Sequence, residues 1–166
     1  IKFAGGRIRF FFECFGERSL MTRGEVLTNL AAVAEKIREL DPDVLLLQEV
    51  DIDSKRCAYV DAVQYLLDHT SLNYGAYASQ WKADYVPSDG IGRVNSGNAV
   101  LSRWPLVDAR RIALPDRGDD FLTDYFYLRR NFLRARIDVP NRDDLWVVAT
   151  HVEAFADDDT KERQIG

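Results

Sequence analysis

Apolar residues recur every three or four positions in two parts of the chain, and this spacing predicts two amphipathic helices. The first helix is expected at 24–40, where the apolar stripe consists of Val26, Leu27, Leu30, Val33, Ala34, Ile37 and Leu40. Thr22 and Glu25 match a capping box at its start, and Asp41-Pro42 ends it. The second helix carries its stripe at Val60, Val63, Leu66 and Leu67.

Short apolar runs outside these helices predict β-strands. We expect strands at Ile8–Phe12, Asp43–Val50, Tyr74–Ser79, Asn98–Ser102, Phe132–Val139 and Leu145–Thr150. The Asp43–Val50 run is apolar on both faces, so both faces should be buried. Residues 84–97 are expected to form a turn-rich loop, and Pro140–Asp143 fits a hairpin turn. The order strand–helix–strand–helix, followed by further strands, favours an α/β (α+β) fold with helices packed on a mixed sheet.

Composition and charge limit the function more than the fold. The 166 residues are 46% hydrophobic and 30% charged, which fits one domain over 1–166. No stretch reaches the ~20 apolar residues that span a bilayer, and no signal peptide is evident in the first residues. We expect a cytoplasmic protein, with export left open because the natural N-terminus can lie upstream. The net charge of -5 disfavours tight, non-specific nucleic-acid binding but not a small phosphorylated substrate. Cys14 and Cys57 are expected to be reduced thiols.

Polar residues at the ends of two predicted strands are the first candidates for chemistry. Glu49 ends a buried strand, and its carboxylate suits a hard cation such as Mg²⁺; the alternative is a polar strand end that faces solvent. His151 follows the Leu145–Thr150 strand, where it can donate a proton or stabilise charge on a phosphoryl group, or serve only the structure. The other histidine, His69, falls late in a helix and is expected at the surface.

Asn98 begins a predicted strand directly after the glycine-rich loop. The start of one antiparallel strand lies at the same sheet edge as the end of its neighbour. Asn98 can therefore face the same cleft as Glu49 and His151. The alternative is an asparagine that satisfies backbone groups of its own loop.

Three segments, taken in order, resemble motifs of one family. Leu-Gln-Glu-Val-Asp at 47–51 resembles the Gln-Glu motif of the endonuclease/exonuclease/phosphatase superfamily. Gly-Asn-Ala-Val-Leu-Ser-Arg-Trp-Pro-Leu at 97–106 is similar to its central Gly-x-Ala-Ile-Leu-Ser-Arg-x-Pro signature. Ala-Thr-His-Val-Glu-Ala-Phe at 149–155 resembles its Thr-His-Leu motif, with Thr160, Arg163 and Gln164 similar to the helix start that follows. The resemblance covers about residues 7–164.

This resemblance implies a deoxyribonuclease-I-like sandwich of two mixed sheets with helices outside, and hydrolysis of phosphate esters with Mg²⁺ or Mn²⁺. Glu49 would be the metal ligand, His151 the phosphate-contacting histidine, and Asn98 a further catalytic and substrate-binding residue. Ser54-Lys55-Arg56, with Asp61 further on, resembles a pattern in bacterial members, in which Arg56 would bind substrate phosphate. The alternatives for Arg56 are a solvated surface position or an ion pair with Asp61.

The chain also departs from the family's pattern. Glu13 stands where the family has an asparagine, and it would be a second metal carboxylate. The later Gly-Asp-x-Asn and Ser-Asp-His motifs are absent, so only the N-terminal part of the domain is expected here and whether the chain is an enzyme stays open.

Two functions remain open on the sequence alone. The first is a phosphoesterase acting on a small molecule, a lipid headgroup or a nucleic acid. The second is a non-catalytic remnant or binding module of the same fold. In either case the absence of most of the second sheet would leave an apolar face of the first sheet exposed, which a homodimer would cover by pairing sheets.

Overall fold

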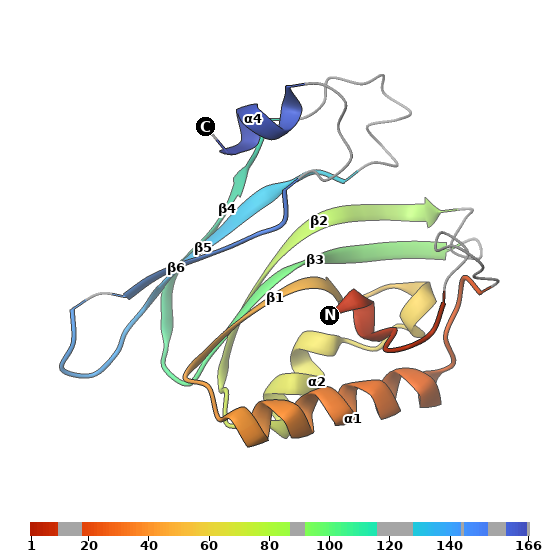
Figure 1. Ribbon diagram of the computed structural model, residues 1–166, viewed down its shortest axis with the longest axis horizontal. Helices are drawn as coiled ribbons and strands as arrows, with labels where there is room; N and C mark the ends of the chain where they lie inside the picture. The colour runs from red at the N-terminus through yellow and green to blue at the C-terminus, as the bar shows by residue number, and fades with distance from the viewer. Residues whose placement is uncertain (10–17, 87–91, 116–127, 144, 153–158, 166) are drawn as a thin grey trace.

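The computed structural model describes residues 1–9, 18–86, 92–115, 128–143, 145–152 and 159–165 of the chain, and it contains two three-stranded sheets (Figure 1). The first sheet has the order β1-β3-β2, formed by β1 (Val44–Asp51), β3 (Gly92–Ser102) and β2 (Tyr74–Val86). The second has the order β4-β5-β6, formed by β4 (Leu106–Ala113), β5 (Asn131–Ile137) and β6 (Leu145–Thr150). The helical segments are η1 (Lys2–Ala4), α1 (Arg23–Leu40), η2 (Lys55–Cys57), α2 (Ala62–His69) and α4 (Thr160–Ile165).

The capping box predicted at the start of α1 is confirmed. The backbone N–H of Glu25 donates to Thr22 Oγ1 at 3.3 Å, and the backbone N–H of Thr22 donates to Glu25 Oε2 at 2.8 Å. Arg18 adds a bidentate contact to the same carboxylate, at 2.7 and 2.8 Å. At the other end, Asp41 adopts a left-handed conformation with φ of 42°, which ends the helix one residue before Pro42.

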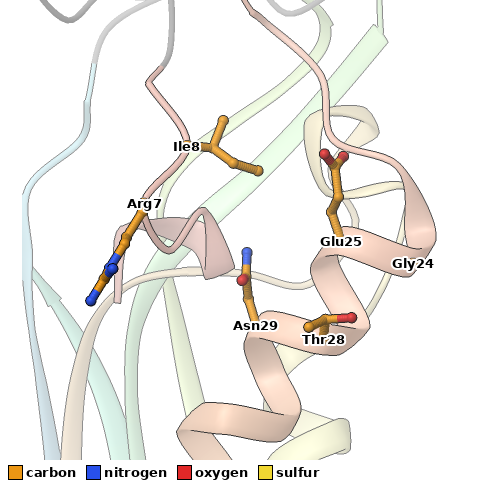
Figure 2. A pocket seen from close by; sticks show the side chains of 6 residues that line it. All are labelled: Arg7, Ile8, Gly24, Glu25, Thr28 and Asn29. Atoms are coloured by element: carbon orange, nitrogen blue, oxygen red, sulfur yellow. The ribbon is translucent and has the colours of Figure 1, made fainter.

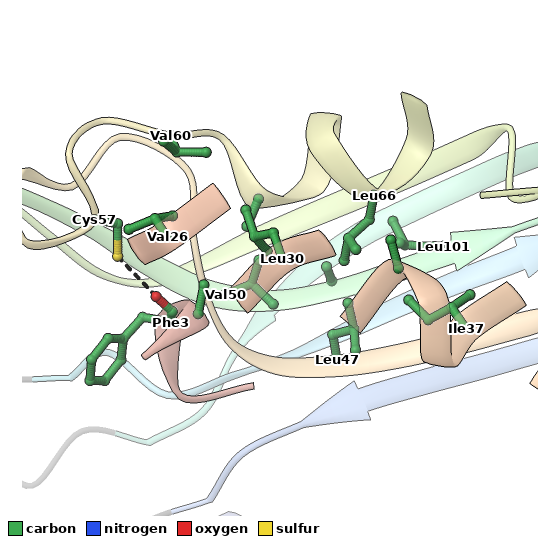
Figure 3. Packing of buried hydrophobic residues seen from close by; sticks show 14 of the residues in the cluster. Phe3, Val26, Leu30, Ile37, Leu47, Val50, Cys57, Val60, Leu66 and Leu101 are labelled. Atoms are coloured by element: carbon green, nitrogen blue, oxygen red, sulfur yellow. Dashed lines mark hydrogen bonds between the residues drawn. The ribbon is translucent and has the colours of Figure 1, made fainter. Parts of the chain in front are cut away.

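The larger hydrophobic core lies between the two helices and the first sheet (Figure 3). Val26 and Leu30 from α1, Leu66 from α2 and Leu101 from β3 are completely buried in it. Truncation of one buried leucine to alanine in such a core costs roughly 2–5 kcal/mol. This layer therefore holds the first sheet rigidly against the helices.

A second, smaller core joins the two sheets. It consists of Ala78 and Val100 from the first sheet and Leu133, Ala135 and Ala149 from the second. In β5, buried and half-buried positions alternate along the whole strand, as expected when one face of a sheet is packed. Three of the five side chains are alanines, so the backbones of the two sheets can approach closely.

Most of the predicted elements are confirmed. The helix expected at 24–40 is α1, and the second stripe forms α2, with Val60 just before it. His69 is the exposed last residue of α2 and stacks on Tyr65 with ring centroids 4.0 Å apart. The strands expected at Asp43–Val50, Asn98–Ser102, Phe132–Val139 and Leu145–Thr150 correspond to β1, β3, β5 and β6, and β5 pairs with β6 in an antiparallel hairpin.

Three predictions about the strands were incomplete or wrong. The loop expected at 84–97 is largely strand, because β2 extends to Val86 and β3 begins at Gly92, and these long strands pair with each other despite the glycines. Strand β4 was not predicted at all. Strand β1 is not buried on both faces, since Leu46 is 46% exposed on an edge strand. Of the strand expected at Ile8–Phe12, only Ile8 and Arg9 are described, and neither lies in a strand.

The α/β class and the sandwich arrangement are confirmed, and every pairing between the described strands is antiparallel. Among the described helices, none is long and apolar enough to cross a membrane.

Acid should weaken the start of α1 through Glu25. The hydrogen bonds from Arg18, and next those from Thr22, lower the pKa of Glu25 to about 2, against 4.5 for an unperturbed glutamate. A depressed carboxyl pKa contributes stability that is complete above the ordinary pKa and lost as pH falls toward the folded-state pKa. Glu25→Gln should therefore lower the urea midpoint at pH 7, with the difference from the parent protein shrinking between pH 4.5 and 2. Glu35→Gln, on the exposed face of α1, controls for net charge; an equal loss in both variants would contradict the assignment.

Candidate active site

A β-bulge in β1 creates the first part of the candidate site. Leu47 pairs with Ala99 and Val50 pairs with Gly97, so Gln48 and Glu49 together oppose the single residue Asn98. A bulge of this kind turns a side chain out of the regular alternation of the strand. It brings Glu49 and Asn98, two of the predicted site residues, to the same point of the first sheet.

Glu49 occupies this bulge in an unfavourable backbone conformation. Its φ is 54°, in the left-handed region that a non-glycine residue with a Cβ seldom adopts. Such strain costs roughly 1–3 kcal/mol and concentrates at functional sites. The side chain is half-buried, and no described lysine or arginine forms an ion pair with it.

The carboxylate of Glu49 is a suitable ligand for a hard divalent cation such as Mg²⁺. In proteins Mg²⁺ is often bound by one or two carboxylates and keeps several of its waters. The described residues contain no group of three or more histidine, cysteine, aspartate or glutamate side chains that would form a cage of protein ligands alone. Within the described residues, Glu49 is therefore compatible with a partly hydrated ion. Glu13, the second predicted ligand, lies outside the described residues.

Hydrogen bonds between the sheets bring His151 to the same region. Gln48 Nε2, from the bulge, donates to the backbone carbonyl of Thr150 at the end of β6. Gln80 Nε2, from β2, donates to the backbone carbonyl of His151 at 3.2 Å. Both donors belong to the first sheet, and the acceptors are the last residue of β6 and the residue that follows it. The backbone of His151, which is half-buried, is thus held against the first sheet.

Asn98 lies in the contact between the two sheets and not on an open surface. It is completely buried, and its Nδ2 makes a long contact of 3.5 Å to the backbone carbonyl of Asn131, the first residue of β5. We call the hydrogen-bonded group of Gln48, Gln80, Asn98, Asn131 and Thr150 the inter-sheet seam. The predicted proximity of Asn98 to Glu49 is present, while its contact with substrate stays a prediction.

Arg56 has a different environment from the one expected. It is 5% exposed, and its Nε and Nη2 donate to the two carboxylate oxygens of Asp51 at 2.7 and 3.0 Å. Its guanidinium also lies 3.9 Å from the centroid of the Phe3 ring. The ion pair suggested with Asp61 is wrong, because Asp61 caps α2 by accepting from the backbone N–H of Gln64. A substrate contact for Arg56 stays a prediction.

The ion pair of Asp51 and Arg56 extends into a small buried network below the bulge. Cys57 Sγ lies 3.2 Å from Asp51 Oδ2 and 3.0 Å from the carbonyl oxygen of Phe3, the contact marked in Figure 3, and its single proton is shared between these acceptors. Cys57 is a buried thiol and Cys14 lies outside the described residues, so the expected reduced state of the two cysteines stays a prediction. Nearby, the hydroxyl of Tyr77 donates to the carbonyl of Val50 at 3.3 Å. Burial, and next the charge of Asp51, raises the pKa of Tyr77 well above its usual value, so this phenol remains a hydrogen-bond donor.

Two surface hollows differ in their relation to the site. One, of about 450 Å³, follows the seam and is lined by Ile1, Leu46, Leu47, Gln48, Val148, Ala149 and Thr150. The other, of about 550 Å³, lies at the start of α1, where the side chains of Glu25, Thr28 and Asn29 extend from the helix and Arg7 and Ile8 lie opposite (Figure 2). None of the predicted site residues lines either hollow. Gln48 and Thr150, which line the first hollow, directly precede Glu49 and His151 in the chain.

The seam contains residues that the sequence did not single out. Gln80 and Asn131 were missed because Gln80 falls inside β2 and Asn131 belongs to no recognised motif. For Asn131 a signal existed, since it stands at the start of a strand as Asn98 does. For Gln80 none existed, because the predicted strand ended at Ser79.

Comparison with known proteins points in one direction. Residues 19–165 match the model described as "Endonuclease/Exonuclease/phosphatase family". A solved endonuclease/exonuclease/phosphatase from Beutenbergia cavernae DSM 12333 is similar, with 26% identity and a TM-score of 0.63 over 82% of this chain and 36% of that one. An endonuclease/exonuclease/phosphatase family protein from Leptotrichia buccalis C-1013-b shares the fold, with 18% identity and a TM-score of 0.51 over 76% of this chain and 49% of that one. The chain thus spans between about a third and a half of these proteins. No curated protein matches it.

Removal of Arg56 should destabilise the protein severely. Arg56→Met leaves the carboxylate of Asp51, which is completely buried, without its partner, at a cost of roughly 3–5 kcal/mol in urea unfolding. Arg93→Met is the matched control, because Arg93 pairs with Asp53 on the surface and such pairs contribute about 1 kcal/mol or less. Similar losses in the two variants would show that the buried pair does not hold this part of the fold.

Proposed function

This chain belongs to the endonuclease/exonuclease/phosphatase family, and we propose that it carries a divalent-metal-dependent site for the hydrolysis of phosphate esters. The family consists of phosphoesterase-type hydrolases in general. The two solved proteins that resemble this chain are longer, so the activity of the whole protein is part of the proposal.

The observation that carries the proposal is the strained bulge at Glu49. A φ of 54° at a glutamate is retained although a regular strand would avoid its cost. The bulge turns Glu49 out of the strand, opposite Asn98, while Gln48 beside it reaches the strand end that precedes His151. These backbone contacts support the proposal that the Glu49 carboxylate and the His151 side chain act on the same phosphate ester.

We assign the following roles. Glu49 would hold Mg²⁺ or Mn²⁺, with Glu13 as a second carboxylate. The cation, when bound, supplies Lewis-acid polarisation of the phosphate. His151 donates a hydrogen bond to a non-bridging phosphate oxygen and so stabilises the charge that develops there. Asn98 helps to place the substrate and the bulge, and Arg56 would contact phosphate only if it exchanged Asp51 for the ligand.

The substrate class stays broad in this proposal. A phosphate ester of a small molecule, a lipid headgroup or a nucleic acid each presents the group that Glu49 and His151 would handle. The net charge of -5 disfavours a site that depends on many backbone phosphates of a nucleic acid. A cytoplasmic location is likewise proposed from the sequence alone.

Glu49→Gln and His151→Ala should each abolish Mg²⁺-dependent hydrolysis of bis-p-nitrophenyl phosphate by this chain. The first substitution removes the charge that holds the cation, and the second removes the donor to the phosphate, an effect of about 10²–10³-fold for a donor of this kind. The measurement is the release of p-nitrophenol with and without Mg²⁺. Glu35→Gln, an exposed glutamate of α1, serves as the control and should retain full activity.

Two results would contradict this function. Hydrolysis that persists in Glu49→Gln would show that Glu49 does not hold the cation. A folded parent protein with no hydrolysis would favour the second candidate, a non-catalytic binding module of the same fold. That second case is still compatible with cation binding at Glu49, which calorimetry measures separately.

We also propose that the protein forms a homodimer through β6. Among the described strands, β6 lies at the edge of its sheet, exposes Leu145, Trp146 and Val148, each 42–48%, and has no charged residue or proline among its six positions. Unprotected apolar edges of this kind pair readily with another strand. Sedimentation should show a dimer at micromolar concentration that Val148→Lys converts to monomer, while Leu40→Lys on the exposed end of α1 has no effect. A monomeric parent protein would exclude the dimer.

A further inference from the structure

We infer that Asn131 is the positioning residue that fixes His151 relative to Glu49 and Asn98, an inference that rests on the proposed function. Asn131 is completely buried at the start of β5, in the second sheet. It was not among the residues predicted from the sequence. Its contacts cross between the sheets at the point where the two halves of the candidate site meet.

The side chain of Asn131 reaches into the first sheet. Its Nδ2 donates to the backbone carbonyl of Ser79 in β2 at 2.9 Å, and to the carbonyl of Arg129 at 3.3 Å. Ser79 pairs with Gly97, the residue before Asn98. A Cβ on Gly97 would lie 2.1 Å from the carbonyl oxygen of Ala78, so the backbones of β2 and β3 leave no room for a side chain here.

The backbone carbonyl of Asn131 contacts Thr150 and Asn98, the neighbours of the two proposed functional residues His151 and Glu49. This carbonyl accepts from Thr150 Oγ1 at 3.3 Å and lies 3.5 Å from Asn98 Nδ2. Thr150 directly precedes His151, and Asn98 opposes the bulge that carries Glu49. One peptide group therefore contacts the neighbours of both proposed functional residues, while its side chain anchors it to the first sheet.

The polarity of this contact favours a functional role over simple packing. The amide oxygens of both Asn98 and Asn131 are buried without a hydrogen-bond partner in the described part of the chain. An unpaired buried polar atom costs roughly 1–3 kcal/mol, and apolar residues fill the rest of the inter-sheet core at no such cost. An asparagine at this position is explained if the directional hydrogen bond from its Nδ2 to the carbonyl of Ser79 sets the spacing between the sheets.

The test compares Asn131→Ala and Asn131→Ser, neither of which can reach the carbonyl of Ser79. The serine variant leaves the smaller void and preserves the test if the alanine variant does not fold. In bis-p-nitrophenyl phosphate hydrolysis, kcat should fall about 10- to 100-fold with KM changed less than about twofold, because the substrate still binds but His151 is displaced. Asn141→Gly, in the exposed turn at the opposite end of the β5–β6 hairpin, is the control and should leave kcat unchanged.

Imidazole NMR supplies a readout that does not depend on turnover. The chain has two histidines, and His69 on α2 serves as an internal reference. Asn131→Ser should shift the imidazole resonances of His151 while those of His69 stay in place. Unchanged His151 resonances, or equal shifts at both histidines, would overturn the inference. An inactive parent protein would refute the proposed function alone, since the NMR comparison would still decide the role of Asn131.

Discussion

The two sheets pack through a thin layer of small apolar side chains, and the hydrogen bonds next to Glu49, Asn98 and His151 depend on that contact. Ala78, Ala135 and Ala149 allow the backbones to approach, and Val100 and Leu133 complete the layer. At one end of this layer the apolar side chains give way to amides and a hydroxyl. The polar groups there are close enough to form hydrogen bonds only because the alanines hold the sheets together elsewhere.

The bulge at Glu49 also depends on the contact between the two sheets. A regular strand would point Gln48 and Glu49 to opposite faces, and neither sheet alone would gain from the left-handed φ at Glu49. The extra residue lets Gln48 contact Thr150 in the second sheet while Glu49 remains near the surface. The strain is thus balanced by contacts that exist only when both sheets are present. This coupling makes the backbone conformation at Glu49 a property of the sandwich and not of the strand.

A buried ion pair holds the end of β1 in place. The buried pair of Asp51 and Arg56, with Cys57 and Phe3 around it, ties the end of β1 to η2 and to the N-terminal segment. A charged pair in this position is costly to bury and is stable only while both partners are present. It fixes the strand end immediately beyond the bulge, and the helices α1 and α2 hold the opposite face of the same sheet. The first sheet is therefore a rigid platform on which the second sheet is placed.

The sequence by itself determined the helices, most strands and the approximate position of the site. Periodic apolar residues and the capping box at Thr22 and Glu25 act within a few residues, so local patterns sufficed for α1 and α2. The motifs around Glu49, Asn98 and His151 indicated a family that the comparisons support. The full lengths of β2 and β3 were missed, because their pairing outweighs the local preference of glycine and aspartate for turns.

Only the tertiary structure decided how the site residues relate to one another. The sequence left open whether Arg56 binds phosphate, lies at the surface or pairs with Asp61. In the structure it is paired with Asp51, because the chain folds back through η2 and buries both groups. Asn131 and Gln80 carried no motif, yet they connect the two sheets. Which polar residues meet across a sandwich depends on the distance and register between its sheets, and those are set by the packing of side chains that lie far apart in the sequence.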